Sequence, residues 1–254
     1  MTRPIIAISL CAALATASAY ADADADAPDL SKVNGSLTAE AGRTYGSIDT
    51  VNGSITVEEK AVTRSVETVN GSITIEAHAR VGGVSTVNGK IVLRNGVNAK
   101  SVETVNGSII GVSNLRIENG IEAVNGSIEI GAGSSVGGNV ETVNGGITLL
   151  AMKVNGNVET VNGNITLGEN TVIGGHLKVN KSKGWGMSWG KPKIPRIVLG
   201  PNSRVVGDLI FEREVELYVH TSAKHGKLIY VEAEAGKAES LKPIVFSGKE
   251  PDFK

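Results

Sequence analysis

The chain has 254 residues, of which 32 are glycine and only 4% are aromatic, so we expect a narrow, aliphatic interior. Its 25 basic and 26 acidic residues nearly cancel, which argues against the broad basic footprint of a nucleic-acid-binding protein. The single cysteine, Cys11, falls in the leader described next, so we expect no disulfide framework and no cysteine nucleophile.

The first 21 residues are typical of a secretory signal peptide. Arg3 gives a positive start, and the apolar run 5–15 is shorter than the roughly 20 residues of a membrane-spanning helix. The Ala-Tyr-Ala pattern at 19–21 predicts cleavage after Ala21, and therefore an exported bacterial protein that is periplasmic, at the outer surface or secreted. Residues 22–30 are rich in Ala and Asp, and we expect them to form a disordered spacer.

The tripeptide Val-Asn-Gly recurs through most of the remaining chain. Successive in-phase copies are 18 or 19 residues apart, and self-similarity at a fixed period indicates a stacked array of repeats. The asparagines of these copies are Asn34, Asn52, Asn70, Asn88, Asn106, Asn125, Asn144 and Asn162. A further copy at 154–156 is out of phase, and it begins 18 residues after Val136, at the position of a second turn.

Each unit has the same internal order, which residues 65–83 illustrate. After the Asn-Gly turn, Ile73 and Ile75 alternate with polar residues, which predicts a strand with one buried face. The triplet Val-Gly-Gly at 81–83 predicts a second turn before the next unit.

Two architectures fit this order. Asn-Gly between β runs also favours hairpins, so an antiparallel meander is the alternative. The runs are too short for the ~9–11 residues of membrane-barrel strands, and a meander would leave one face uncovered. Each coil of a solenoid closes its own core. We therefore predict an all-β, single-stranded parallel β-solenoid with 18-residue coils over residues 31–231, on the order of 50 Å long.

Stacked coils place equivalent residues in columns. The motif asparagines are then expected to form a ladder of side-chain amides that runs from coil to coil, a structural role. The glycine that follows each asparagine is expected to allow a left-handed backbone.

The pattern Val-x-Thr-Val-Asn-Gly-x-Ile over residues 33–167 resembles the bacterial adhesin-type β-solenoid domains, including the head-GIN type. The stretch 165–175, repeated at 197–209, is similar to bactofilins, the polymer-forming β-helix proteins. These resemblances imply a right-handed solenoid with a structural or adhesive role and no catalytic residues. The predicted secretion signal departs from the usual cytoplasmic bactofilin.

No constellation with an evident chemistry stands out. The position two before each motif valine forms an acidic column, which we interpret as a solvated outer face that discourages sheet-to-sheet pairing: Asp49, Glu67, Ser85, Glu103, Glu122, Glu141 and Glu159. A divalent-cation stripe is the alternative, although the Asp-rich pattern of calcium loops is absent. The four histidines lack metal-ligand spacing, so we predict no metal, no cofactor and no catalytic site.

The repeat is interrupted at residues 181–195. Aligning Val179-Asn180 with the motif leaves about 14 extra residues before Ile197, inserted at the Asn-Gly turn. A register shifted by one residue is the alternative, because the segment 176–180 is one residue shorter than its counterparts. Tryptophans beside cations on an exposed loop suit an anionic glycan, a lipid surface or an envelope protein; folding back onto the rod is the alternative. The candidate binding residues are Trp185, Trp189, Lys181, Lys183, Lys191, Lys193 and Arg196.

We expect residues 232–254 to form a C-terminal cap or tail, anchored by the apolar run 244–246. The sequence thus favours an exported, non-enzymatic solenoid that acts as a structural or adhesive surface module through the Trp/Lys loop. A secreted bactofilin-like polymer, self-associating through the solenoid ends, and a β-helix polysaccharide lyase or hydrolase remain as alternatives. No nucleic-acid partner is expected.

Overall fold

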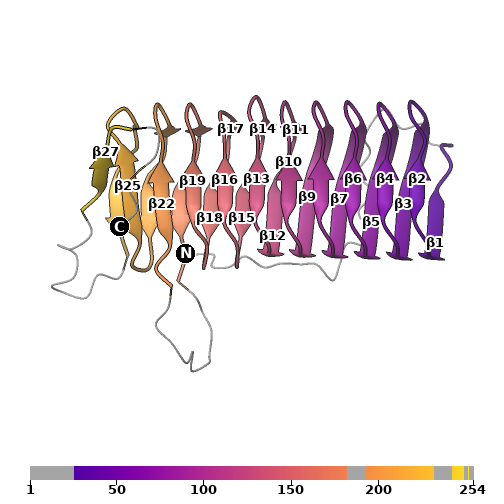
Figure 1. Cartoon of the computed structure of the whole chain (residues 1–254), viewed down its shortest axis with the longest axis horizontal. Helices are drawn as coiled ribbons and strands as arrows, with labels where there is room; N and C mark the ends of the chain where they lie inside the picture. The colour runs from indigo at the N-terminus through magenta and orange to yellow at the C-terminus, as the bar shows by residue number, and fades with distance from the viewer. Residues whose placement is uncertain (1–25, 182–192, 232–241, 249–250, 252–254) are drawn as a thin grey trace, which may run out of the picture.

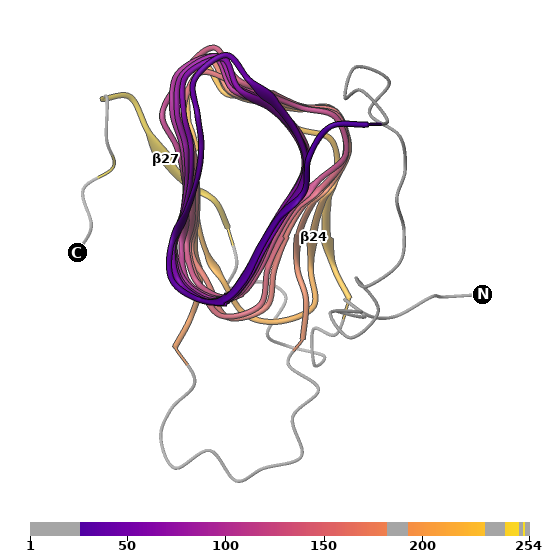
Figure 2. The same ribbon diagram turned by 90° about the vertical axis from the view of Figure 1, so that its right-hand side faces the viewer.

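The computed structural model describes residues 26–181, 193–231, 242–248 and 251. Within these residues the chain forms 27 strands and no helix, and all strand pairs are parallel, which confirms the predicted β-solenoid. Coils lie side by side along one axis, with β1 at one end and β27 at the other (Figure 1). Viewed down that axis, the coils enclose a flattened interior (Figure 2).

One side of the rod is an eleven-stranded parallel sheet built from the runs that follow each Asn-Gly turn. Its length of eleven strands at ~4.8 Å agrees with a rod on the order of 50 Å long. Its strands are β2 (Leu37–Ala39), β4 (Ile55–Val57), β6 (Ile73–Ile75), β8 (Ile91–Leu93), β10 (Ile109–Gly111), β13 (Ile128–Ile130), β16 (Ile147–Leu149), β19 (Ile165–Leu167), β22 (Arg196–Leu199), β25 (Glu216–His220) and β27 (Ile244–Phe246).

A sixteen-stranded sheet forms the rest of the wall. In the first coils each coil contributes a single strand to this sheet: β1 (Leu30–Asn34), β3 (Thr44–Asn52), β5 (Val62–Asn70), β7 (Arg80–Asn88) and β9 (Asn98–Asn106). Beyond β9 each long strand is replaced by two short ones. One series is β11 (Arg116–Ile117), β14 (Ser135–Val136), β17 (Lys153–Val154), β20 (Val172–Ile173) and β23 (Arg204–Val205). The other is β12 (Ile121–Asn125), β15 (Val140–Thr142), β18 (Val158–Thr160), β21 (Leu177–Val179), β24 (Leu209–Phe211) and β26 (Leu228–Tyr230).

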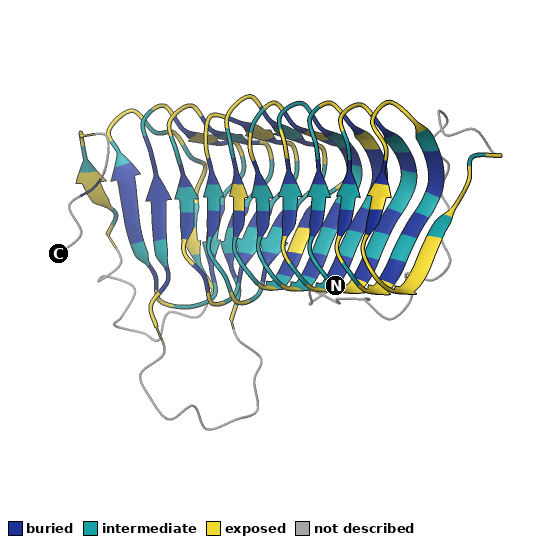
Figure 3. Ribbon diagram, turned by 45° about the vertical axis from the view of Figure 1, so that its right-hand side comes forward, coloured by how far each residue is buried: buried dark blue, intermediate teal, exposed yellow. Residues whose placement is uncertain are grey.

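The core is a column of mostly aliphatic side chains that point inward from the stacked strands, and these buried residues are the dark bands on the ribbon in Figure 3. Ile73 and Ile75 are fully buried, and the intervening Thr74 faces outward, as the alternation predicts. Aromatic side chains enter the core at both ends: Tyr45 is buried in the first coils, and near the C-terminal end Phe211 and Tyr230 pack with ring centroids 5.5 Å apart.

The second turn lies elsewhere than predicted. Residues 81–83 continue the long strand β7, and the chain turns instead at His78, whose φ is 61°. Equivalent residues in other coils share this left-handed conformation: Gly42, Lys60, Gly96, Asn114, Gly133, Ala151, Asn170 and Asn202. The Gly-Gly pair at 137–138 does separate β14 from β15, so the predicted turn exists only in the later coils. The same Val-Gly-Gly triplet lies within a continuous strand at 81–83 and at the junction of two strands at 136–138, so the triplet alone does not predict where a strand ends.

The motif glycines also have a different role from the one predicted. Only the first, Gly35, has a positive φ, of 116°. At Gly71 an added Cβ would lie 1.9 Å from the carbonyl oxygen of Gly53 in the preceding coil. Glycine is therefore needed because neighbouring coils approach closely at this corner, where a methyl group would collide with backbone.

Both ends of the solenoid differ slightly from the predicted bounds. The backbone N–H of Gly46 donates to the carbonyl of Pro28, so the described end of the expected spacer is already bonded to the first coil, and β1 begins at Leu30. At the other end, the apolar run 244–246 forms β27 and pairs with β25, as expected for the anchor of the tail.

Candidate functional site

The motif asparagines form a continuous hydrogen-bonded ladder along one corner of the rod. Each amide nitrogen donates to the amide oxygen of the preceding coil, as Asn88 Nδ2 does to Asn70 Oδ1 at 2.9 Å. Seven such bonds join eight residues, with donor–acceptor distances of 2.8–3.0 Å. The ladder holds successive coils in register, the structural role expected from stacking.

A second row of hydrogen bonds lies inside this corner, and it was not predicted from the sequence. The buried hydroxyl of Thr68 donates to the carbonyl of Gly53 at 3.0 Å, and Thr50, Thr86, Thr104 and Thr142 make the equivalent bond. The recurrence of Thr before Val-Asn-Gly was the available signal. By contrast, the motif valine faces outward, and Val69 is exposed.

The asparagine ladder ends at a clamp made by Arg213. Its Nη1 donates to Asn162 Oδ1 at 2.7 Å and to the Val161 carbonyl at 3.1 Å. Its Nη2 donates to the carbonyl of Lys193 at 2.9 Å. One guanidinium therefore closes the ladder and fixes the residue at which the chain returns from the 181–195 insertion.

The insertion begins in the alternative register, shifted by one residue from the motif alignment. Val179 pairs with Thr160, so Asn180 occupies the position of Val161 and is not part of the Asn ladder. Ile197 pairs with Ile165, 32 residues earlier, because this coil-to-coil step contains the insertion. The steps in which every residue is described are 18–20 residues long. Asn180 is instead turned to Glu159, to which its Nδ2 donates at 3.2 Å.

The structure describes only the two roots of this predicted binding loop. Lys181 and Lys193 are exposed, and the backbone N–H of Lys181 donates to Glu212 Oε2 at 3.0 Å. Arg196 belongs to β22; its Nε lies 3.1 Å from Glu216 Oε2 and its guanidinium 5.8 Å from the ring centre of Tyr218. Its charge is thus engaged by the next coil. The remaining candidates, Trp185, Trp189, Lys183 and Lys191, lie outside the described residues.

The acidic column runs along β3, β5, β7 and β9 and continues on β12, β15 and β18. Strand pairing places Glu103, Glu122, Glu141 and Glu159 in line, one per coil. Burial raises the pKa of Glu122, and the carboxylates of Glu141 and Glu103 raise it further. Burial raises the pKa of Glu67 in the same way, with neighbouring carboxylates adding to the effect.

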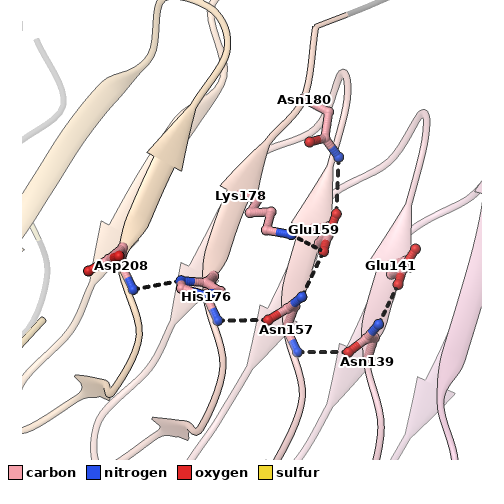
Figure 4. A network of polar contacts seen from close by, with 8 residues as sticks. All are labelled: Asn139, Glu141, Asn157, Glu159, His176, Lys178, Asn180 and Asp208. Carbon is pink, nitrogen blue, oxygen red and sulfur yellow. Dashed lines mark hydrogen bonds and ion pairs between the residues drawn. The ribbon is translucent and has the colours of Figure 1, made fainter. Parts of the chain in front are cut away.

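Amide side chains support the C-terminal half of this column. Asn139 Nδ2 donates to Glu141 at 2.8 Å, and Asn157 Nδ2 donates to Glu159 at 3.0 Å (Figure 4). Lys178 ends the column, with its Nζ 3.1 Å from Glu159 Oε1. Burial raises the pKa of Glu141, and the hydrogen bond from Asn139 opposes that rise.

A parallel chain of side chain–backbone bonds runs beside the carboxylates. The amide oxygen of Asn139 accepts from the N–H of Asn157, whose own oxygen accepts from the N–H of His176, both at 2.8 Å. His176 Nδ1 in turn accepts from the N–H of Asp208 at 2.9 Å (Figure 4). These bonds take the place of backbone hydrogen bonds between coils where the backbone bends. The Nδ1 atom of His176 therefore has a structural role.

The described residues contain no group of three or more His, Cys, Asp or Glu side chains arranged to hold a metal ion. The described part of the chain also contains no apolar helix of membrane-spanning length. Comparison with protein families, with characterised proteins and with solved structures finds no match to this chain.

Proposed function

We propose that this protein is an exported, non-enzymatic β-solenoid that serves as a structural or adhesive module of the bacterial cell envelope. In this proposal it contacts an anionic glycan, a lipid surface or an envelope protein through the insertion at 181–195. The solenoid acts as a rigid spacer, and the insertion carries the contact.

The observation that carries this proposal is the clamp at the roots of the insertion. The repeat columns at this corner are taken up by coil-to-coil bonds, whereas the insertion is the largest departure from the coil register and contains both tryptophans. Arg213 and Glu212 hold its two roots to the solenoid. A contact loop with fixed roots on a rigid scaffold loses less entropy on binding than a free one.

The test is a binding screen of the mature protein against polygalacturonate and against vesicles containing phosphatidylglycerol. The double substitution Trp185→Ala with Trp189→Ala is expected to lower binding at least tenfold, because indole rings supply the buried area of such contacts. The far-UV circular dichroism spectrum should not change, because the solenoid core is untouched.

A matched control removes apolar surface from the rod itself. Val51→Ala with Val69→Ala truncates two exposed side chains of the motif column and should leave binding unaltered. Binding that survives the tryptophan substitutions would refute a contact role for the insertion.

A second candidate function, end-to-end polymerisation, is favoured by the terminal strands. β1 and β27 each have one strand neighbour, and Val33 and Val245 on them are 66% and 65% exposed. Open edges with apolar side chains are prone to pair with further strands. Electron microscopy of the purified protein distinguishes the two functions, because a strictly monomeric preparation excludes the polymer.

A further inference from the structure

Basic residues recur at every second coil along one side of the rod. Strand pairing aligns eight successive coils in a single outward-facing column: Val62, Arg80, Asn98, Arg116, Ser135, Lys153, Val172 and Arg204. A bridge from Arg204 places Lys224 in the coil directly after it, where it extends the column by one cation. We refer to Arg80, Arg116, Lys153, Arg204 and Lys224 as the basic row.

The basic row is exposed and, as far as Arg204, evenly spaced on a rigid wall. All five side chains are exposed, and the residues that follow four of them, Ile117, Val154, Val205 and Val81, are buried in the core. Since strands are ~4.8 Å apart, alternate coils place cations about 9.6 Å apart. Within the described part of the chain, Arg116, Lys153, Arg204 and Lys224 make no ion pair.

The outward column that follows the row along each strand adds little negative charge. The neighbouring outward column contains one acid, Glu118, and it also contains Lys100 and Arg64. In the later coils the two columns lie on different strands: Glu122, Glu141 and Glu159 belong to β12, β15 and β18, whereas Arg116, Lys153 and Arg204 belong to β11, β17 and β23. Of the strands that carry the row, β11 and β17 are labelled along the upper edge in Figure 1. In the earlier coils both columns share the long strands, as on β9, where Asn98 and Glu103 are five residues apart. In the later coils, the near-zero net charge of the chain thus conceals a basic and an acidic column on different strands.

We propose that the basic row binds an extended acidic polysaccharide that lies along the rod axis and carries one anionic group per disaccharide. Evenly spaced cations on a rigid wall match a linear polymer with sparse, regular charges. This inference goes beyond the proposed function, because the row needs no residue of the insertion and lies at a different corner of the coil.

The row fits other linear or like partners less well. A nucleic-acid strand carries a phosphate about every 3.4 Å, far more densely than the row carries cations, and the column contains no aromatic side chain for base stacking. A second copy would have to offer its acidic column, and two of its carboxylates, Glu141 and Glu159, are already hydrogen-bonded to Asn139, Asn157 and Lys178.

The test uses hyaluronan oligosaccharides, which carry one carboxylate per disaccharide, and isothermal titration calorimetry at low ionic strength. The triple substitution Arg116→Ser, Lys153→Ser and Arg204→Ser should weaken hyaluronan binding at least tenfold. A control triple, Lys32→Ser, Lys90→Ser and Arg94→Ser, removes the same charge from exposed positions outside the row and should change affinity less than threefold.

A gain-of-function variant tests the spacing. Asn98→Lys, Ser135→Lys and Val172→Lys fill the neutral coils, and should shift preference from hyaluronan towards polygalacturonate, which is acidic at every sugar. The proposal is overturned if both triple variants lose affinity equally, if single-stranded DNA binds the wild type more tightly than hyaluronan, or if the wild type binds no hyaluronan. Unaltered melting temperatures show that the variants are folded, and intact tryptophans in all of them keep this test separate from that of the insertion.

Discussion

The glycine of the Val-Asn-Gly motif is fixed by the distance between coils and only in the first copy by a positive φ. At Gly145 a Cβ would lie 2.1 Å from the carbonyl oxygen of Gly126, whereas at the adjacent Gly146 the nearest atom is 3.6 Å away. Neither residue has a positive φ. Two neighbouring glycines in the same turn therefore differ sharply in what they tolerate.

We expect Gly145→Ala to destabilise the protein by about 1–3 kcal/mol, because the new methyl group meets backbone that cannot move aside. Gly146→Ala should be neutral or stabilise the fold by up to about 1 kcal/mol, since it only restricts the unfolded chain. Chemical denaturation measures both changes. Equal effects of the two substitutions would show that coil contact does not determine the first glycine.

The sequence predicted some residue roles and missed others for a definable reason. The period places every asparagine in one column, so the amide ladder follows from the spacing of the motif alone. The outward orientation of Val69 and the hydroxyl bond of Thr68 depend on which residue starts the inward alternation, and the corner bend resets that alternation. The pattern therefore determined the columns and the direction of the side chains after the Asn-Gly turn, but not the direction of those before it.

At the scale of the strand, the charged carboxylates of the acidic column lower the stability of the folded protein. Carboxylates in successive parallel strands repel one another, and burial disfavours their charged forms. A raised folded-state pKa means that the folded protein binds more protons than the unfolded chain. Stability from this column is thus complete well below pH 4.5, the ordinary value, and falls as pH rises through the raised pKa.

We expect Glu122→Gln to raise the melting temperature at pH 7 by about 1–2 °C, because relief of like charge at a half-exposed site is worth well under 1 kcal/mol. The gain should disappear well below pH 4.5, where the glutamate is already neutral. Thermal unfolding followed by circular dichroism across pH measures the effect.

Glu129→Gln is the matched control for this experiment. Glu129 is exposed on β13, and its strand neighbours are the uncharged Ile110 and Thr148. Its melting temperature should show no comparable gain at pH 7. A gain at Glu122 that persists at low pH would rule out ionisation as the cause.

Over the whole molecule, each coil rests only on its two neighbours, so stability is close to a sum of coil and interface contributions. The strand registers between β3, β5, β7 and β9 are uniformly 18 residues. Removal of one whole unit here should therefore rejoin matching columns.

We expect deletion of residues 70–87 to give a folded protein with one coil fewer and a melting temperature within a few degrees of the parent. Deletion of residues 70–78 leaves half a coil, places strand residues at the turn, and should prevent folding of the array. Circular dichroism and limited proteolysis distinguish the outcomes. Loss of structure in both variants would contradict a modular array.

The overall architecture was predictable because a fixed period implies stacking, whereas the basic row was not. Arg80 and Arg116 are 36 residues apart, but Lys153 follows 37 residues later and Arg204 51 residues after that. One-residue insertions at the bends and the long insertion at 181–195 hide the alternation until strand pairing aligns the coils. The insertion itself was visible in the sequence, and strand pairing selects the register shifted by one residue, in which Asn180 is not a motif asparagine.

The alternation of the basic row has a consequence for how such a rod lengthens through gene duplication. A duplicated segment of one coil preserves the fold, because each of its residues stacks on the equivalent residue of the neighbouring coil. The same duplication places two cations or two neutral residues in adjacent coils and puts the charges beyond it out of step. Only duplication of two coils together preserves both the fold and the alternation of the basic row. The repeating unit of the charged surface is therefore two coils, whereas the repeating unit of the fold is one coil.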